Sequence, residues 1–295
     1  MSRRGALGVV GLAAAGLSGL YEAVRYVGSP SPRPKVVAGT TRLVEAYGPT
    51  ARQVGEWWVP PTSTPTSTPT SRGPLPTVVL VHGGYWRDTY DRHLEDAVAA
   101  DLAGRGYLVW NVDYAPSSDP WPATLTDAAA GYDFAFTGHY ADRVDRSHVA
   151  VVGHSAGGHL ALWLASRSRL KAGAPGAGPH VVPALAVPQA PVAALAKASA
   201  LGLGAGAVDA LLGGPPAREP GRYAIADPLG LVPSGVRTVL VHGVRDQIVP
   251  LSQSEAYLAA AGPTCSLLTV PGGHFAHLNP ASRAGEALRT ALSSL

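Results

Sequence analysis

The sequence predicts an α/β protein built on a mostly parallel, doubly wound sheet, and three observations support this prediction. From Thr77 onward, short apolar runs alternate with segments that have helical apolar spacing. Some of these runs are apolar throughout, which is typical of parallel strands that are buried on both faces. Residues able to perform chemistry directly follow the predicted strands, and in such sheets functional residues gather at the carboxyl ends of the strands.

Length and composition limit the number of domains, the size of the core and the classes of partner. The 295 residues suffice for one large domain or two small ones, and an apolar content of 46% is enough for a sizeable core. The net charge of +3 is spread out, with no cluster of Lys and Arg interleaved with aromatic residues, so we expect no nucleic-acid partner. The single cysteine, Cys265, lies in an apolar run and is predicted to be a buried strand residue that forms no internal disulfide.

Residues 1–27 resemble an export signal or an anchor. Met1-Ser2-Arg3-Arg4 precedes an apolar stretch at 5–20, as in secretory signals, and the paired arginines resemble a twin-arginine motif. The stretch is shorter than the roughly 20 residues that comfortably span a bilayer. We therefore expect an exported or membrane-tethered protein. The alternatives are a small-residue helix that rests on the domain and a cytoplasmic location.

A spacer and then a single domain follow. Residues 28–41 are rich in proline and are predicted to form the spacer, and residues 42–295 form the domain. A strand pair is expected at 42–47 and 53–59. The Pro/Thr/Ser-rich segment at 60–76 is predicted to be a flexible surface loop within the domain, because the apolar stretches on both sides look like strands of one sheet.

The core elements then come in alternating order. The predicted strands of the core are 77–81, 107–112, 148–152, 181–187, 238–241 and 266–270. The predicted helices are 94–102, 123–136, a segment that starts directly after Gly157, and 281–292. Residues 191–221, rich in Ala, Gly and Leu, are predicted to form a small cap over the functional site.

The pentapeptide Gly-His-Ser-Ala-Gly at 153–157 has the form of a nucleophile elbow. It follows the apolar run at 149–152 and precedes a helical pattern, and this strand–turn–helix context exposes the hydroxyl of Ser155 on a strained turn. Gly153 and Gly157 supply the small residues that such a turn needs, because the strand and helix backbones nearly collide there. The alternative is a glycine-rich turn with an idle serine.

Two further strand ends carry an acid and a base. Asp246 lies on the loop after the strand at 238–241, and His274 follows the strand at 266–270. The order Ser155, Asp246, His274 is that of the α/β-hydrolases. In this arrangement the histidine takes the serine proton and later protonates the leaving group, while the aspartate fixes the histidine tautomer.

Other histidines compete for the role of the base. His277 is the rival, but it comes three residues later and is predicted to lie at the start of the last helix, so His274 is preferred. His154 and His159 are expected to pack or to form structural hydrogen bonds. After the strand at 77–81, the glycines of His82-Gly83-Gly84-Tyr85-Trp86 let backbone N–H groups face a developing oxyanion, and the N–H of Ala156 adds another.

The motif at 82–86, together with Gly-His-Ser-Ala-Gly-Gly-His-Leu-Ala at 153–161, resembles the kynurenine formamidase (arylformamidase)-like branch of the esterase/lipase α/β-hydrolases. The similarity extends over 47–57 and from Thr77 to the C-terminus. It implies an α/β-hydrolase fold and a serine hydrolase without metal or cofactor. The implied substrate is a small ester or an N-formyl aryl amide, cleaved through an acyl-enzyme.

The resemblance also implies roles for individual residues. The oxyanion hole would be formed by the backbone N–H groups of Gly83, Gly84 and Ala156. An aromatic pocket for the acyl or leaving group would be lined by Tyr85, Trp86 and Trp121, for which plain core packing is the alternative. Two other functions remain open: a peptidase for short peptides, and a non-catalytic binding protein with the same fold. A filled triad argues against the binding protein.

Overall fold

The computed structural model describes residues 34–61 and 73–295. The predicted signal-like segment at 1–27, the first part of the 28–41 spacer and most of the 60–76 loop lie outside the described residues. Within the described ranges, no helix combines the length and the apolar character that crossing a membrane requires.

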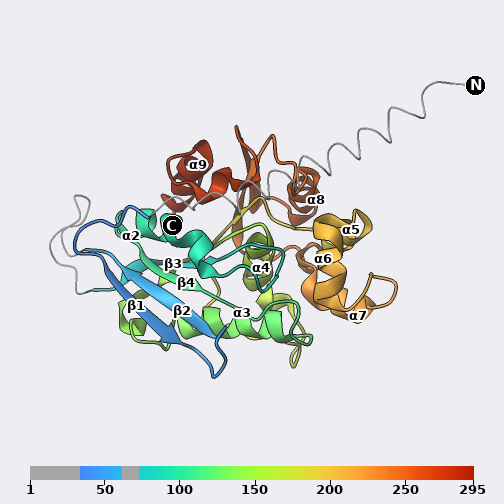
Figure 1. Cartoon of the computed structure of the whole chain (residues 1–295), viewed down its shortest axis with the longest axis horizontal. Coiled ribbons are helices and arrows are strands. Elements are labelled where there is room, and N and C mark those ends of the chain that lie inside the picture. Colours follow the sequence, from blue (N-terminus) through green and yellow to red (C-terminus); the bar gives the residue numbers. More distant parts are fainter. Residues whose placement is uncertain (1–33, 62–72) are drawn as a thin grey trace, which may run out of the picture.

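The fold is organised around an eight-stranded sheet with the order β1-β2-β4-β3-β5-β6-β7-β8. Figure 1 labels its first four strands. Strands β1 (Thr41–Ala46) and β2 (Val54–Val59) pair antiparallel, and β2 also pairs antiparallel with β4 (Leu108–Val112). All other pairings are parallel. They involve β4 and the strands β3 (Leu75–Val81), β5 (Val144–His154), β6 (Leu185–Gln189), β7 (Arg237–Gly243) and β8 (Cys265–Val270). The predicted mostly parallel sheet is confirmed.

Helices cover both faces of the sheet, so its central strands are apolar on both sides. Successive side chains of a strand point to opposite faces. In β3, Val79 and Val81 pack into one buried cluster, whereas Val78 and Leu80 pack into the other. The first cluster and a smaller one beside it lie under α3 (Ala123–Phe134), α4 (Ala156–Ala165) and α8 (Ser252–Ala261), and the second lies under α2 (Asp96–Ala103) and α9 (Arg283–Leu292).

The segment predicted to form a cap folds into three short helices that gather at one side of the molecule (Figure 1). They are α5 (Leu195–Ala200), α6 (Leu203–Leu212) and α7 (Pro220–Ala226). Residues 204–206 at the start of α6 have positive φ and are not helical, so the regular part of α6 begins at Ala207. The segment is thus helical, and its last helix extends beyond the predicted boundary at Gly221; its role as a cap over the site stays a prediction.

Three details differ from the sequence predictions. The strand predicted at 181–187 is β6 (Leu185–Gln189), because the chain before Leu185 is irregular. Cys265 is only partly buried, since β8 is the edge strand of the sheet and most of its residues are exposed or half-exposed. The last helix, α9, begins at Arg283, so His277 lies before it in the short 3-10 helix η5 (His274–Leu278).

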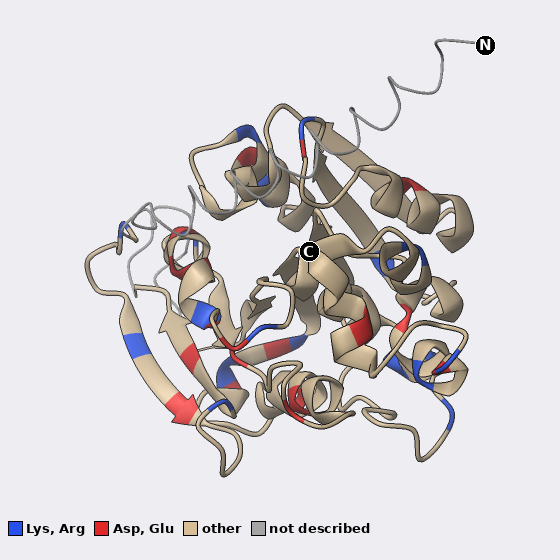
Figure 2. Cartoon of the chain, turned by 45° about the vertical axis from the view of Figure 1, so that its right-hand side comes forward, with Lys and Arg blue, Asp and Glu red and all other residues tan. Residues whose placement is uncertain are grey.

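Charged side chains are sparse on this fold, and the two signs are interspersed along the described ribbon (Figure 2). Some form short-range pairs on helices, such as Arg105 with Asp101 and Arg283 with Glu286. Exposed pairs of this kind contribute about 0–1 kcal/mol each. The stability of the domain therefore depends mainly on its apolar clusters.

A buried carboxyl group makes stability depend on pH. Glu95 ends the 3-10 helix η1 (Arg92–Glu95), is 0% exposed, and neither of its carboxyl oxygens has a hydrogen-bond partner among the described residues. Burial, and to a lesser extent the nearby charge of Asp96, raises the pKa of Glu95 from 4.5 to about 8. The folded protein therefore retains this proton over a pH range in which the unfolded chain has lost it.

We expect Glu95→Gln to remove this pH dependence. Because the pKa is raised in the folded state, the wild type loses stability relative to the variant as pH rises above about 4.5, and the loss levels off above about 8. Between about pH 4 and pH 9, the difference in unfolding free energy should therefore shift toward the variant by up to about 5 kcal/mol. Urea unfolding of both proteins at several pH values measures the difference, and a difference that is constant with pH would contradict the prediction.

Candidate active site

Ser155 lies in the sharp turn between β5 and α4. Its φ of 58° and ψ of −116° fall in a region that non-glycine residues rarely adopt, at a cost of about 1–3 kcal/mol. Its backbone N–H donates to the carbonyl of Gln189, the last residue of β6, at 2.8 Å. The neighbouring strand therefore helps to hold the strained residue in place.

The two glycines of the pentapeptide are required by close backbone contacts. A Cβ atom on Gly153 would lie 2.2 Å from the carbonyl oxygen of Gly157. A Cβ atom on Gly157 would lie 2.0 Å from the carbonyl oxygen of Val81, at the end of β3. Any larger residue would push the strand and the helix apart, so the local sequence determines this turn.

Asp246 and His274 form a close pair at the ends of β7 and β8. The distance from Asp246 Oδ2 to His274 Nδ1 is 2.7 Å, and the Asp246 side chain is 0% exposed. The backbone N–H groups of Ile248 and Val249 both donate to Oδ1 of Asp246 at 2.9 Å. These contacts hold the carboxylate and orient the imidazole ring.

The same contacts determine the charge of Asp246. Burial alone would raise its pKa, but attraction to the protonated form of His274 and hydrogen bonds from His242, His274 and Val249 outweigh this effect, so the pKa lies well below its ordinary value. An ionised carboxylate can only accept a hydrogen bond, so Nδ1 of His274 carries the proton and donates it. The other ring nitrogen, Nε2, is then the one able to accept a proton.

Ser155 and His274 line the same cavity, which has a volume of about 50 Å³. The structure thus brings together the serine, the histidine and, behind the histidine, Asp246. The remaining wall of the cavity is mostly apolar and is formed by Gly84, Tyr85, Tyr90, His154, Leu94, Ile248, Phe275 and Leu278.

The loop after β3 runs beside the serine in a strained conformation. Gly84, Tyr85 and Trp86 have φ values of 109°, 52° and 55°, so three consecutive residues lie in the left-handed region. A Cβ atom on Gly83 would lie 2.7 Å from the carbonyl oxygen of His154 and 3.1 Å from Cβ of Ser155, so this loop packs directly on the elbow. Ala156 is the first residue of α4, where backbone N–H groups have no acceptor within the helix.

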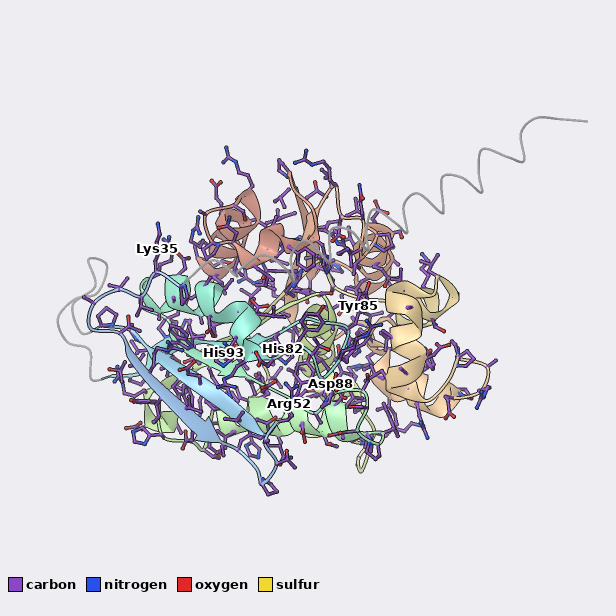
Figure 3. The ribbon with its side chains drawn as sticks, in the orientation of Figure 1. Lys35, Arg52, His82, Tyr85, Asp88 and His93 are labelled. Carbon is purple, nitrogen blue, oxygen red and sulfur yellow. The ribbon has the colours of Figure 1, made fainter. Side chains whose placement is uncertain are left out.

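Of the three aromatic residues expected to line a pocket, only Tyr85 does so. It lines the cavity beside Ser155 and donates from its hydroxyl group to the carbonyl of Ile248 at 3.2 Å, between the core and the cap (Figure 3). Trp86 is 0% exposed and packs edge-on against His159, so its predicted role in substrate binding is wrong. Trp121 is partly buried, packs against the core with Arg222 over its ring and is not among the residues that line this cavity, so its role stays a prediction.

The other histidines have structural surroundings. His154 donates from Nε2 to the carbonyl of His274 at 3.0 Å, and His159 donates from Nε2 to the carbonyl of Ala226 at 2.9 Å. His277 is 0% exposed and does not line the cavity; burial and the charges of His274 and His242 lower its pKa to about 3. Over the described ranges, no group of three or more His, Cys, Asp or Glu residues is suited to hold a metal ion.

His242 is a contributor that the sequence did not predict. Its Nε2 atom donates to the carbonyl of Val249 at 3.0 Å and lies 3.5 Å from Oδ2 of Asp246, while its Nδ1 atom accepts from the hydroxyl of Ser254 at 2.7 Å. His242 therefore supports the acid loop from beneath. Its place at the end of a predicted strand, four residues before the acid, was the available signal.

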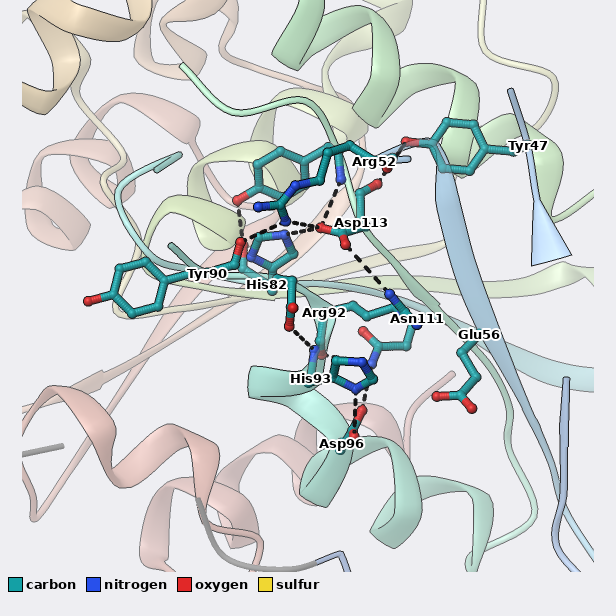
Figure 4. Close-up of polar contacts among 12 residues, drawn as sticks. Tyr47, Arg52, Glu56, His82, Tyr90, Arg92, His93, Asp96, Asn111 and Asp113 are labelled. Carbon is teal, nitrogen blue, oxygen red and sulfur yellow. Dashed lines mark hydrogen bonds and ion pairs between the residues drawn. The ribbon is translucent and has the colours of Figure 1, made fainter. Parts of the chain in front are cut away.

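A second unpredicted group is a buried polar network behind the loop after β3 (Figure 4). Its centre is Asp113, which accepts from Nε2 of His82 at 3.0 Å and from Nη1 of Arg52 at 3.3 Å. The Nδ1 atom of His82 lies 2.7 Å from the carbonyl oxygen of Gly83, and Arg92 lies 3.6 Å from the other oxygen of Asp113. The network thus fixes the backbone just before Gly84.

Solved structures share this fold. Esterase B from Lactobacillus rhamnosis has a TM-score of 0.74 and 23% identity, with coverage of 96% of this chain and 95% of the esterase. A truncated carbohydrate esterase from gut microbiota has a TM-score of 0.73 and 17% identity, with coverage of 88% and 98%. The predicted α/β-hydrolase fold is therefore confirmed.

Sequence relatives are consistent with the fold. The carboxylesterase NlhH of Mycobacterium tuberculosis is 34% identical over 111 residues, which are 35% of this chain and 33% of NlhH. The chain spans 33% or less of the length of the curated relatives that it matches. The model of the BD-FAE family, however, matches residues 66–260, which is more than half of the chain and includes the serine and the acid. The chain belongs to the BD-FAE family.

Proposed function

We propose that the protein is a serine hydrolase that cleaves carboxylic esters through an acyl-enzyme, with Ser155 as nucleophile, His274 as base and Asp246 as the acid that orients the base. The observation that carries the proposal is the strained Ser155 beside His274, whose Nδ1 atom is bound to a buried carboxylate at 2.7 Å. Similarity to a carboxylesterase supports the same reaction class.

The chemistry follows from these protonation states. A serine hydroxyl is scarcely ionised at neutral pH and needs a base to become a nucleophile. Nε2 of His274 takes the proton of Ser155 as Oγ attacks the ester carbonyl, and the resulting imidazolium faces the ionised Asp246. The same proton then goes to the departing alcohol, and water repeats the sequence on the acyl-enzyme.

The oxyanion is stabilised by backbone groups in this proposal. The N–H groups of Gly83, Gly84 and Ala156 are the donors, and each such donor contributes about 3–4 kcal/mol to stabilisation of the transition state. The strained φ values at 84–86 and the network around Asp113 support this role, because both hold the loop in one conformation before substrate arrives. A preorganised loop needs no rearrangement during the reaction.

N-formyl aryl amides are the second proposed substrate class. The proposal rests on the resemblance of the motifs at 82–86 and 153–161 to kynurenine formamidase-like hydrolases. The small cavity beside Ser155 is compatible with it, because a formyl group is the smallest acyl group. Comparing p-nitrophenyl acetate with N-formylkynurenine as substrates tests the choice, and no turnover of the formamide would remove this class.

A fluorophosphonate probe tests the central proposal. We expect the full chain to gain the mass of one probe adduct and the Ser155→Ala variant to gain none, because only an activated serine reacts at a useful rate. Intact-mass measurement reads the result, and circular dichroism shows that the variant is folded. A folded wild type without an adduct would contradict the proposal and favour a non-catalytic binding protein.

We also propose, from the sequence alone, that residues 1–27 direct export or tether the protein to a membrane. Fractionation of cells that produce the full chain or a chain without these residues tests this location. Equal recovery of both chains in the soluble cytoplasmic fraction would contradict it.

A further inference from the structure

Much of the apolar wall of the cavity beside Ser155 comes from two segments that are far apart in sequence. Tyr90 and Leu94 lie on the stretch that follows the strained loop after β3, and Phe275 and Leu278 lie on η5, directly after His274. The volume of about 50 Å³ corresponds to only a few water-sized spheres of about 10–15 Å³ each, and the wall is mostly apolar. The cavity therefore suits a short apolar group.

The acyl group fits this description better than the leaving group. The leaving alcohol must depart and be replaced by water before deacylation, whereas the acyl group stays on Ser155 throughout. A narrow apolar cavity next to the nucleophile suits the part that stays. The mostly apolar wall also suits an alkyl chain better than a sugar, whose hydroxyl groups would lose their hydrogen bonds to water there.

We propose that this cavity holds the acyl chain and that Tyr90 limits its length, so that acetyl to butyryl groups are accepted and longer chains are excluded. The proposal rests on the serine hydrolase function proposed above. Tyr90 is the limiting residue because its ring packs against the backbone of Gly84: a Cβ atom on Gly84 would lie 2.5 Å from the ring. The ring thus forms the part of the cavity wall beside the proposed oxyanion donors.

Tyr90 is held in place by Arg52, from the connection between β1 and β2. Nη1 of Arg52 donates to the carbonyl of Tyr90 at 3.0 Å and to Oδ1 of Asp113 at 3.3 Å, and Nη2 donates to the carbonyl of Asp88 (Figures 3 and 4). Asp113 also binds His82, directly before the glycines. The buried carboxylate of Asp113 therefore contacts both the residue before the proposed oxyanion donors and Arg52, which binds the backbone of Tyr90. Arg52 acts as a positioning residue.

The test is the acyl-length profile of the full chain. With p-nitrophenyl acetate, butyrate and octanoate, we expect the wild-type kcat/KM for octanoate to be about 100-fold or more below that for butyrate. Tyr90→Ala should raise the ratio of the octanoate value to the acetate value by about 10-fold or more. Tyr90→Phe keeps the ring and should keep the wild-type profile.

Three further variants keep the test decisive. Leu94→Ala widens the same cavity and should also favour octanoate, even if loss of Tyr90 disturbs Gly84 or prevents folding. Arg52→Met should relax the length selectivity and raise KM for butyrate, and Arg52→Lys should restore both in part, because a lysine can still donate to the carbonyl of Tyr90.

Failure of this inference differs from failure of the proposed function. The wild type could react with a fluorophosphonate while Tyr90→Ala and Leu94→Ala keep its acyl-length profile. That result would overturn only the acyl cavity. The variants could instead change only the preference among acetyl esters of different alcohols. That result would assign the cavity to the leaving group and would also overturn the acyl cavity. Absence of both labelling and ester hydrolysis would overturn both proposals.

Discussion

His274→Ala is expected to lower kcat/KM for ester hydrolysis by about 10⁴- to 10⁶-fold, the range seen when a serine hydrolase loses its base. Without Nε2 of His274, the proposed mechanism lacks the base that accepts the proton of Ser155. Asp246→Asn should cost about 10⁴-fold, because an amide can donate to Nδ1 and so favour the wrong histidine tautomer. Steady-state kinetics with p-nitrophenyl butyrate measures both losses.

His277→Gln is the matched control for this prediction. His277 lies on the same short 3-10 helix as His274, but it is fully buried and does not line the cavity. A folded variant should retain kcat/KM within about 10-fold of the wild type. A loss as large as that of His274→Ala would contradict the assignment of the base and make His277 the candidate instead.

Gly157→Ala is expected to destabilise the protein by about 3 kcal/mol or more and to abolish activity. The added Cβ would lie 2.0 Å from the carbonyl oxygen of Val81 and 2.5 Å from that of His82, and no rotamer change can relieve contacts with backbone atoms. The helix must then move away from the sheet and carry Ser155 with it. The midpoint of urea unfolding and the rate of ester hydrolysis measure the two effects.

Gly221→Ala is the control that distinguishes the effect of this backbone contact on stability from the general effect of replacing glycine by alanine in a helix. Gly221 also lies in a helix, α7, and nothing stands within 4 Å of the position its Cβ would take. Alanine is favoured over glycine in helices by about 1 kcal/mol, so this variant should be as stable as the wild type or more stable. Equal destabilisation by both substitutions would show that the contact with Val81 is not the cause.

Local sequence signals predicted the framework of the site. The turn at Ser155 could be recognised because Gly153, Gly157 and the flanking apolar runs encode it within a few residues. Asp246 and His274 could be placed at the same sheet edge because parallel strands end together. The structure brings these side chains to one cavity, and their catalytic roles stay predictions that the variants above test.

Contacts between distant segments could not be predicted in this way. Arg52 reaches Tyr90 from another part of the chain, and no spacing rule connects the two. Trp86 sits beside the glycine motif, yet the strained backbone turns its side chain into the core, which no pattern in 82–86 indicates. Cys265 lies in an apolar run, but only the sheet order shows that its strand is an edge.

Because β8 is an edge strand, the segment that carries His274 is expected to unfold more easily than the segment that carries Ser155. The serine follows a central strand, whereas His274 follows a strand that pairs on one side only and is largely exposed. Edge elements with few buried contacts open at a lower free energy than the centre of a domain. Mild heat or denaturant would thus detach the base while the middle of the sheet stays intact. Hydrolytic activity then reports local opening at the C-terminal border rather than global unfolding.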